Sequence, residues 1–384
     1  MPKASLPAYL PILVVERSQL AGLAATTDAV KDGLTPLFDV VRLDGAPSRA
    51  GRLGAPLATR HAEVQLAEIL GAVSRAWDVG HPAFLDCRTG RGDERLPDGR
   101  VHLAWLLDEA RRRGLPLIPV TGLRRPSPYQ LAVADAAHVD GRGACLRLEL
   151  PDFHELGALE ARIDAIVDQL GLTPERIDLV VDLGLIAHAE VALLEVTARA
   201  VLAPVARAAS WRTVTLAASS LPGRDDRDPI WARDAEPTAP RTIARTEWLL
   251  WRALARASSP VGRSLRFGDY GAQWAADGGR ATRDGHHPVY YTHDSEWLVL
   301  DAAPQEVPAA AGAGAADATS VASVAGGVGG LVARPEFHGA AHCAGDACFA
   351  DCEPNDAGAP DPAVWRAAAT THHLTMVVEQ LERI

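Results

Sequence analysis

The stretch ACLRLELPDFHELGALEARIDAIVDQLGLTPERIDLVVDLG, residues 144–184, contains one complete strand–helix–strand unit. Two short apolar runs, 144–150 and 177–184, enclose the amphipathic segment 155–171, which ends in glycine as a helix C-terminus commonly does. Two strands that are joined through a helix run parallel in the same sheet. This stretch therefore predicts a parallel sheet with helices packed outside it.

The same alternation repeats along the chain, with one helix candidate between each strand candidate and the next. The eight strand candidates are residues 9–15, 34–41, 82–88, 115–122, 144–150, 177–184, 211–222 and 263–271. Eight such units are typical of a TIM-barrel-like (β/α)8 fold. An open doubly wound sheet is the alternative, but no glycine-rich phosphate-binding motif follows the first strand candidate.

The C-terminal part of the chain has a different character. We predict a barrel over residues 1–285, an extended segment over 286–302, a flexible Ala/Gly-rich loop over 303–332, and an extension with a closing helix over 333–384. The loop contains long runs of alanine and glycine, a composition typical of linkers.

Composition excludes several classes of protein. The net charge of −11 over 384 residues argues against a direct electrostatic grip on nucleic acid. The sequence shows neither a secretory signal nor an apolar run long enough to span a membrane. Five cysteines do not form the even framework of a disulfide-rich domain. We therefore predict a cytoplasmic protein that does not engage the membrane.

Side-chain parity along the strand candidates points to a polar barrel interior. Arg147 and Glu149 share one face of their strand, and Asp86 and Arg88 share one face of theirs, as Asp182 does with its alternating neighbours. Active sites of such barrels lie at the C-terminal ends of the strands. Two interpretations stay open: an internal salt-bridge network that holds the barrel, or a pocket for an anionic ligand or a metal.

The closing helix contains adjacent histidines, His372 and His373. Adjacent helical side chains diverge by about 100°, so we expect one histidine to face the protein and the other the helix edge. A structural histidine and a functional histidine that completes the barrel site are both open. The predicted catalytic residues are Asp86, Glu149, Asp182 and His372.

A third group of chemical residues lies in FHGAAHCAGDACFADCEP, residues 337–354. Thiolate and imidazole are ligands that zinc favours, although the cysteine spacing lacks the paired CxxC knuckles of structural zinc sites. The candidate metal ligands are His342, Cys343, Cys348 and Cys352. The alternative is a loop or hairpin in which these are ordinary small residues.

Several motifs in order resemble the phage beta protein family. They are YLPILVVERSQLAGL and PLFDVV near the N-terminus, then RTEWLLW, FGDYG, VYYTHDSEWLVL, GD at 345–346 and WRAAATTHHLTMVVEQL. The resemblance implies a barrel with a recurring C-terminal extension and a link to phage–host conflict, and it supplies no catalytic residues. Matched positions together with the polar strand faces give these predicted ligand-binding residues: Glu16, Arg88, Arg147, Asp269, Tyr270, Arg366 and His373.

These observations favour a barrel protein that binds a small, anionic or peptide ligand at its C-terminal mouth. One alternative is a non-enzymatic protein-interaction scaffold of a phage-defence or exclusion module, with Trp248 and Trp251 as anchors. A second alternative is a metal-dependent hydrolase or lyase, in which a divalent metal is the cofactor. The sequence leaves open whether the protein is an enzyme.

Overall fold

The structure is a computed structural model. It describes residues 9–41, 43, 55–89, 92–187, 189–208, 210–222, 241–256, 264–273, 287–302, 328–351 and 362–384. The chain forms two compact units. The first contains Met1–Val15, Lys31–Ser219 and Thr246–Tyr270, and the second contains Glu16–Val30, Ser220–Arg245 and Gly271–Ile384. The second unit therefore takes two segments from within the range predicted for the barrel.

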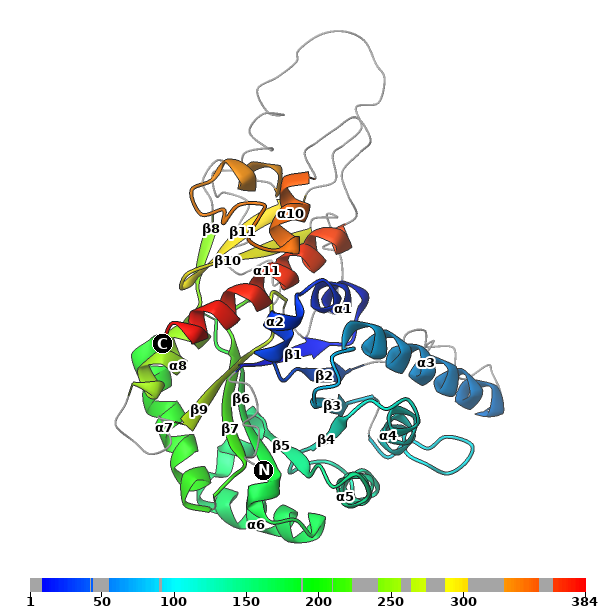
Figure 1. The fold of residues 1–384 in the computed structure, drawn as a ribbon. Coiled ribbons are helices and arrows are strands. Elements are labelled where there is room, and N and C mark those ends of the chain that lie inside the picture. The colour runs from blue at the N-terminus through cyan, green and yellow to red at the C-terminus, as the bar shows by residue number, and fades with distance from the viewer. Residues whose placement is uncertain are drawn as a thin grey trace. The chain divides into compact units, whose positions relative to one another are not determined.

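Eight parallel strands close into a barrel in the first unit, which confirms the predicted fold (Figure 1). The strands, in their order around the barrel, are β1 Tyr9–Val14, β2 Leu37–Val40, β3 Ala83–Cys87, β4 Leu117–Thr121, β5 Ala144–Leu148, β6 Ile177–Leu185, β7 Thr213–Ser219 and β9 Leu265–Asp269. Closure comes from parallel pairing of β9 with both β7 and β1. Each strand falls within or next to a predicted apolar run.

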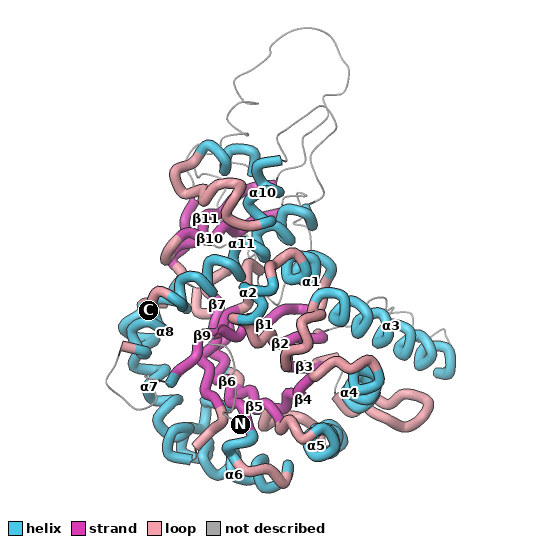
Figure 2. Tube along the Cα trace, viewed as in Figure 1, coloured by secondary structure: helices cyan, strands magenta, loops and turns pink. Residues whose placement is uncertain are grey.

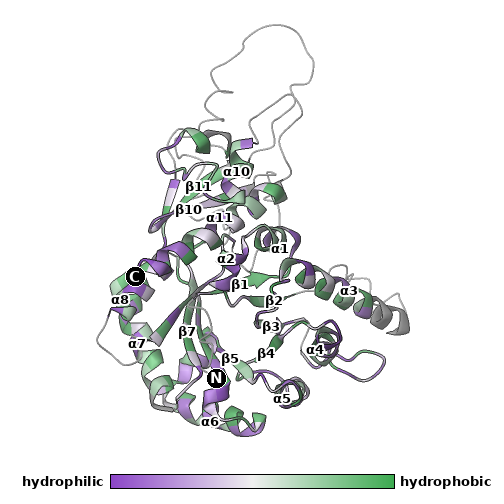
Figure 3. Cartoon of the chain, in the orientation of Figure 1, coloured by the Kyte–Doolittle hydropathy of each residue, from purple (hydrophilic) through white to green (hydrophobic). Residues whose placement is uncertain are grey.

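Helices surround the barrel and connect its strands. They are α2 Asp28–Asp32, α3 Ala55–Ala76, α4 His102–Arg112, α5 Ser127–Asp140, α6 Leu156–Leu170, α7 Val191–Ala208 and α8 Thr246–Ala255, with the short 3-10 helices η1 Leu150–Glu155 and η2 Pro174–Arg176. Hydrophilic and hydrophobic residues alternate along α6 and α7, as expected of helices with one solvated face (Figure 3). Gly171 ends α6 in a left-handed conformation, which glycine adopts without a steric penalty.

Strand parity divides the barrel into an apolar outer layer and a polar interior. On β5, Leu146 and Leu148 are fully buried on one face, whereas Arg147 projects from the other face and reaches carboxylates on β2, β3 and β6. Such contacts between distant strands require the side chain to cross the barrel interior. The polar face of β5 therefore points into the barrel, as predicted.

The second unit is built on a three-stranded antiparallel sheet in the order β10-β11-β8. Its elements are α1 Arg17–Ala24, β8 Arg241–Ala244, β10 His287–His293, β11 Glu296–Ala302, η5 Val328–Ala333, α10 Ala344–Asp351 and α11 Pro362–Glu382. The extended segment and the closing helix were predicted. Strand β8 was not predicted; its four residues stand directly before α8, between two of the predicted strand candidates.

Helix α11 is the centre of the second unit, and α1, α10 and β10 all pack against it (Figure 2). Two glycines permit this close packing. A Cβ added at Gly22 would lie 2.6 Å from the Ala367 carbonyl oxygen, and one added at Gly345 would lie 2.2 Å from that of Ala368. The Ala/Gly-rich segment lies outside the described residues up to residue 327, and its end forms η5.

None of the helices in the described ranges is long and apolar enough to cross a membrane.

Candidate functional site

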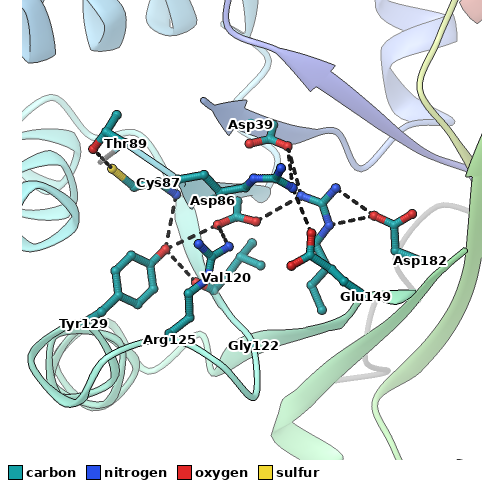
Figure 4. A network of polar contacts seen from close by, with 12 residues as sticks. Asp39, Asp86, Cys87, Thr89, Val120, Gly122, Arg125, Tyr129, Glu149 and Asp182 are labelled. Atoms are coloured by element: carbon teal, nitrogen blue, oxygen red, sulfur yellow. Dashed lines mark hydrogen bonds and ion pairs between the residues drawn. The ribbon is translucent and has the colours of Figure 1, made fainter. Parts of the chain in front are cut away.

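Arg147 lies at the centre of the barrel interior and is 1% exposed. Its Nε donates to Asp182 Oδ2 at 2.9 Å, and its Nη1 donates at 3.0 Å both to Asp39 Oδ2 and to Asp86 Oδ2. These carboxylates project toward one point from β2, β3 and β6 (Figure 4). One guanidinium thus ties β5 to three other strands of the barrel.

The remaining nitrogen of Arg147 is also occupied. Nη2 donates to the Tyr270 hydroxyl at 3.0 Å, and this hydroxyl donates to Asp182 Oδ2 at 2.6 Å. Burial opposes the charged form of Arg147, but Tyr270 and the surrounding carboxylates outweigh it and raise the pKa of Arg147 well above its ordinary value. Arg147 is therefore a permanently charged internal tie, and its donors already have acceptors.

Asp86 receives a second guanidinium from the loop after β4. Arg125 Nη2 donates to Asp86 Oδ1 at 2.6 Å, and the Arg125 guanidinium lies over the Tyr129 ring at 5.2 Å from its centroid. The Tyr129 hydroxyl in turn donates to the Val120 carbonyl at 3.0 Å (Figure 4). The carboxylate predicted for acid–base work is thus held between two arginines.

Asp39 is less completely satisfied than its neighbours. Its Oδ2 accepts from Arg147, but its Oδ1 is buried without a hydrogen-bond partner in the described part of the chain. Burial raises the pKa of Asp39 above its ordinary value, against the opposing effect of Arg147. Asp39 is the carboxylate of this network whose charge is least well compensated.

Arg88 and Glu149 form the rim of the network at the C-terminal ends of β3 and β5. Arg88 Nη1 lies 2.9 Å from Glu149 Oε1 and 3.6 Å from Asp39 Oδ2. The two side chains are 34% and 41% exposed, whereas Asp86 and Asp182 are buried. The structure therefore brings together the five barrel residues that parity singled out, with a buried floor and a solvated rim.

The other predicted residues divide between the two units. Asp269 is buried in the barrel and accepts from the Tyr9 hydroxyl at 2.6 Å. Glu16 belongs to the second unit and accepts from Ser18 Oγ at 2.7 Å, and Arg366 lies on α11. The predicted ligand-binding set is therefore not one cluster within either unit.

A second cluster of chemical side chains converges on Asp346 at the start of α10. Asp346 Oδ2 lies 2.6 Å from His342 Nδ1, 2.8 Å from His372 Nδ1 and 3.2 Å from Cys343 Sγ. The other oxygen, Oδ1, accepts from the Tyr291 hydroxyl at 2.9 Å. Three potential donors thus share one carboxylate oxygen.

The ionisation of this cluster follows from the shared carboxylate. The hydrogen bond to Asp346 raises the pKa of His342 to about 10. Burial opposes ionisation of Asp346, but hydrogen bonds from His342 and His372 outweigh it and hold the pKa of Asp346 below its ordinary value. Burial also opposes the Cys343 thiolate, and hydrogen bonds from the same histidines still lower the pKa of Cys343.

The two adjacent histidines have different environments, and both are fully buried. His373 Nδ1 lies 2.7 Å from Thr292 Oγ1, and its ring stacks on Trp297 at 4.7 Å between centroids. The expectation that one histidine faces the helix edge is wrong, because α1, α10 and β10 cover α11 from several sides. The described contacts of His372 belong to the Asp346 cluster, within the second unit.

Sequence reasoning found only part of this cluster. His342 and Cys343 were predicted as metal ligands, but Cys348 packs against the apolar core and Cys352 lies outside the described residues. Asp346 was not assigned to a metal, and His372 was predicted to complete the barrel site, not this cluster. The available signal was the Gly345–Asp346 pair and the HH pair, both of which stand among the motifs that carry the family resemblance.

The family model described as "Beta protein" matches residues 9–379, which is nearly the whole chain. No curated protein matches the chain.

Proposed function

The chain belongs to the beta protein family, and we propose that its barrel binds a ligand with an anionic group, such as a carboxylate or a phosphate, at the C-terminal ends of the strands. Arg88 carries this proposal. Within the described part of the chain, Nη1 is the only side-chain nitrogen of Arg88 that forms a hydrogen bond, and its acceptor is Glu149 Oε1. Its Nε and Nη2 are therefore donors at a rim that solvent reaches.

Arg125 supports the same function from the neighbouring loop. It is 17% exposed and uses Nη2 for Asp86, while the Tyr129 ring holds the guanidinium plane in place. Planar guanidinium groups bind carboxylate and phosphate oxygens through paired N–H donors. Two such groups at one barrel end suit a small anionic ligand or the carboxyl end of a peptide.

The floor of the network favours binding over chemistry. A general base must lie within hydrogen-bond reach of the proton that it abstracts, so its oxygens must be open to a substrate. Asp86 is bound by Arg147 and Arg125, Asp182 by Arg147, and Glu149 by Arg88. A metal-dependent hydrolase or lyase at these residues is therefore the weaker proposal.

A protein-interaction scaffold is the second candidate, and a specific surface feature favours it. Leu193 and Val196 lie one helical turn apart on α7 and are 66% and 67% exposed. Trp248 and Trp251, the predicted anchors, are instead buried and stack on each other at 5.2 Å, so they contribute to the core. In either case we propose a role in phage–host conflict, which the membership of the beta protein family supports.

The proposal is tested by thermal denaturation of the full chain with citrate, inorganic phosphate, a nucleoside monophosphate and a dipeptide with a free carboxyl group. A ligand that binds the folded state raises the midpoint in a concentration-dependent way. We expect this shift in the wild type, its loss in Arg88→Gln, and its enhancement in Glu149→Gln, which releases Arg88 from its carboxylate.

The matched control is Arg199→Gln, an arginine on α7 that pairs with Glu195 on the same helix. This variant should keep the wild-type shift. The proposal fails if none of the four probes shifts the midpoint, or if Arg88→Gln and Arg199→Gln respond alike. Retention of pull-down partners by Arg88→Gln and their loss in Leu193→Glu would favour the scaffold.

A further inference from the structure

We infer that His342, Cys343, Asp346 and His372 form a structural zinc centre in the second unit. One ligand atom from each of the four residues lies within 4.8 Å of the other three. Zinc binds imidazole nitrogen, thiolate sulfur and carboxylate oxygen, and its structural sites have four protein ligands in a tetrahedron. The four residues supply two nitrogens, one sulfur and one oxygen.

The distances fit an ion after a small adjustment of one side chain. Ligand atoms on a tetrahedral zinc lie about 3.3–3.8 Å apart, since zinc–ligand bonds are about 2.0–2.3 Å long. Asp346 Oδ2 is instead 2.6–3.2 Å from the other three atoms. A retreat of this oxygen by about 1 Å opens the position that an ion takes between the four atoms.

Groups on the far side of each histidine ring favour metal binding through the atom that faces the cluster. His372 Nε2 donates to the Thr292 carbonyl at 2.8 Å, whereas His342 Nε2 forms no hydrogen bond in the described part of the chain and lies 3.3 Å from the Glu379 carboxylate oxygen Oε1. When Nε2 carries the proton, Nδ1 is left with a lone pair, and in both rings Nδ1 is the atom that faces the cluster. Histidines that ligate metals usually show this pairing of one nitrogen with a carbonyl or a carboxylate.

The two anionic ligands are supported in the same way. Tyr291 donates to Asp346 Oδ1 at 2.9 Å, which leaves Oδ2 for the centre. The Asp346 backbone N–H points to Cys343 Sγ at 3.4 Å, a contact that stabilises a thiolate. These partners belong to β10 and to the first turn of α10 itself, so the site is held by elements that the second unit already packs together.

Charge balance also favours an ion at this place. One divalent cation with a thiolate, a carboxylate and two neutral imidazoles has a net charge of zero. Buried charges are costly unless they are compensated, and Asp346 and His372 are fully buried. His342 is 13% exposed on its side chain, which leaves a route for the ion to enter. The ion would clamp the start of α10 to α11.

The first test is the metal content of the purified full chain, measured by elemental mass spectrometry. We expect about one zinc ion per chain in the wild type. Asp346→Asn, Cys343→Ser and His372→Gln should each lose most of it. Cys348→Ser and His373→Gln are matched controls, because they change the same residue types outside the group of four ligands, and both should retain the metal.

Cobalt provides a readout on the wild type itself, so the main result does not require that any variant folds. Wild-type protein that has been stripped with a chelator and reloaded with cobalt should show the ligand-field bands of tetrahedral cobalt and a thiolate-to-cobalt charge-transfer band. The charge-transfer band should be absent in Cys343→Ser and present in Cys348→Ser. The inference is overturned if the wild type binds neither zinc nor cobalt, or if cobalt binds without the thiolate band.

Discussion

The two polar clusters of this protein have inverse charge arrangements. In the barrel, the Arg147 guanidinium is surrounded by carboxylates from three other strands. In the second unit, one oxygen of Asp346 is surrounded by two imidazoles and a thiol. Both clusters are buried at their centres, yet only in the first does each nitrogen of the central group have an acceptor among the surrounding side chains.

The difference lies in what the central group can satisfy. A guanidinium has five N–H donors in a fixed plane, so it can bind several carboxylates at once with good geometry. A single carboxylate oxygen cannot serve three donors equally well. The barrel cluster therefore behaves as a finished internal tie, whereas the Asp346 cluster has the donor set of a site that an ion completes.

Arg147→Met should have the largest effect and tests the barrel cluster. Removal of the guanidinium leaves Asp39, Asp86 and Asp182 buried without their common partner, and breaking a buried ion pair typically costs about 3–5 kcal/mol. Urea unfolding followed by circular dichroism would measure the loss. Arg199→Met, at an exposed helical pair, should change stability by about 0.5 kcal/mol or less. Equal effects of the two substitutions would show that the interior network is solvated.

Gly345→Ala tests the packing that positions the Asp346 cluster. The added Cβ would lie 2.2 Å from the Ala368 carbonyl oxygen and 3.0 Å from the His372 backbone nitrogen, so α10 must move away from α11. We expect a loss of about 1–3 kcal/mol, which is typical of overpacking, together with a lower zinc content. Gly157→Ala on α6 is the control, because nothing lies within 4 Å of its Cβ. A wild-type melting temperature for Gly345→Ala would contradict this packing.

Prediction from the sequence was most successful where a local pattern determines the structure. Alternation along β5 places Leu146 and Leu148 against the helices and Arg147 in the interior, and a period of two is visible in a single strand. Apolar runs that alternate with amphipathic segments predicted the eight barrel strands, and parity along them predicted the five polar residues at their C-terminal ends.

The sequence failed where the determining contact is not local. Asp346 meets His372 because Gly345 lets two helices approach closely, and the two residues are 26 positions apart. The burial of both His372 and His373 depends on three other elements that cover α11. Strand β8 forms because it pairs with β11, whereas its four residues show no strand pattern in the sequence.

Asp182→Asn and Asp39→Asn compare two carboxylates of the same network. Asp182 accepts from Arg147 and from Tyr270, so its neutralisation should cost about 1.5–3 kcal/mol, the range for hydrogen bonds to charged groups. Asp39 has one oxygen without a partner in the described ranges, so its loss should cost less than about 1 kcal/mol. Parallel urea titrations at neutral pH would rank them, and the reverse order would contradict the contact pattern.

The difference in stability between the wild type and Asp39→Asn should also depend on pH. Burial raises the folded-state pKa of Asp39, so the folded state holds this proton more tightly than the unfolded state does. The resulting stability is present below the ordinary aspartate pKa and is lost as the pH rises through the folded value. Asp39→Asn lacks this loss, so its stability relative to the wild type should increase over that rise. A difference in stability between the two proteins that does not change with pH would show that Asp39 does not have a raised pKa in the folded state.

Arg88→Gln should have the smallest effect on stability. Its ion pair with Glu149 is exposed, at 34% and 41% for the two side chains, and such pairs contribute about 0–1 kcal/mol. The variant should therefore unfold within about 1 kcal/mol of the wild type. This result would separate the solvated rim from the buried floor of the barrel cluster. A loss of stability as large as that of Arg147→Met would instead show that Arg88 belongs to the buried part of the network.

The segments of the two units alternate along the chain, and this affects how the protein folds and whether it can be cut into independent parts. Helix α11 bonds to α1 through Thr371 Oγ1 and the Gly22 carbonyl, 349 residues apart. The second unit is therefore incomplete until α11 has been synthesised, and its slowest folding step should be the closure of this very long loop. Cutting the chain at any single point removes a segment from one unit or the other. Neither unit is therefore a terminal module of the chain, and the family match over residues 9–379 spans both of them.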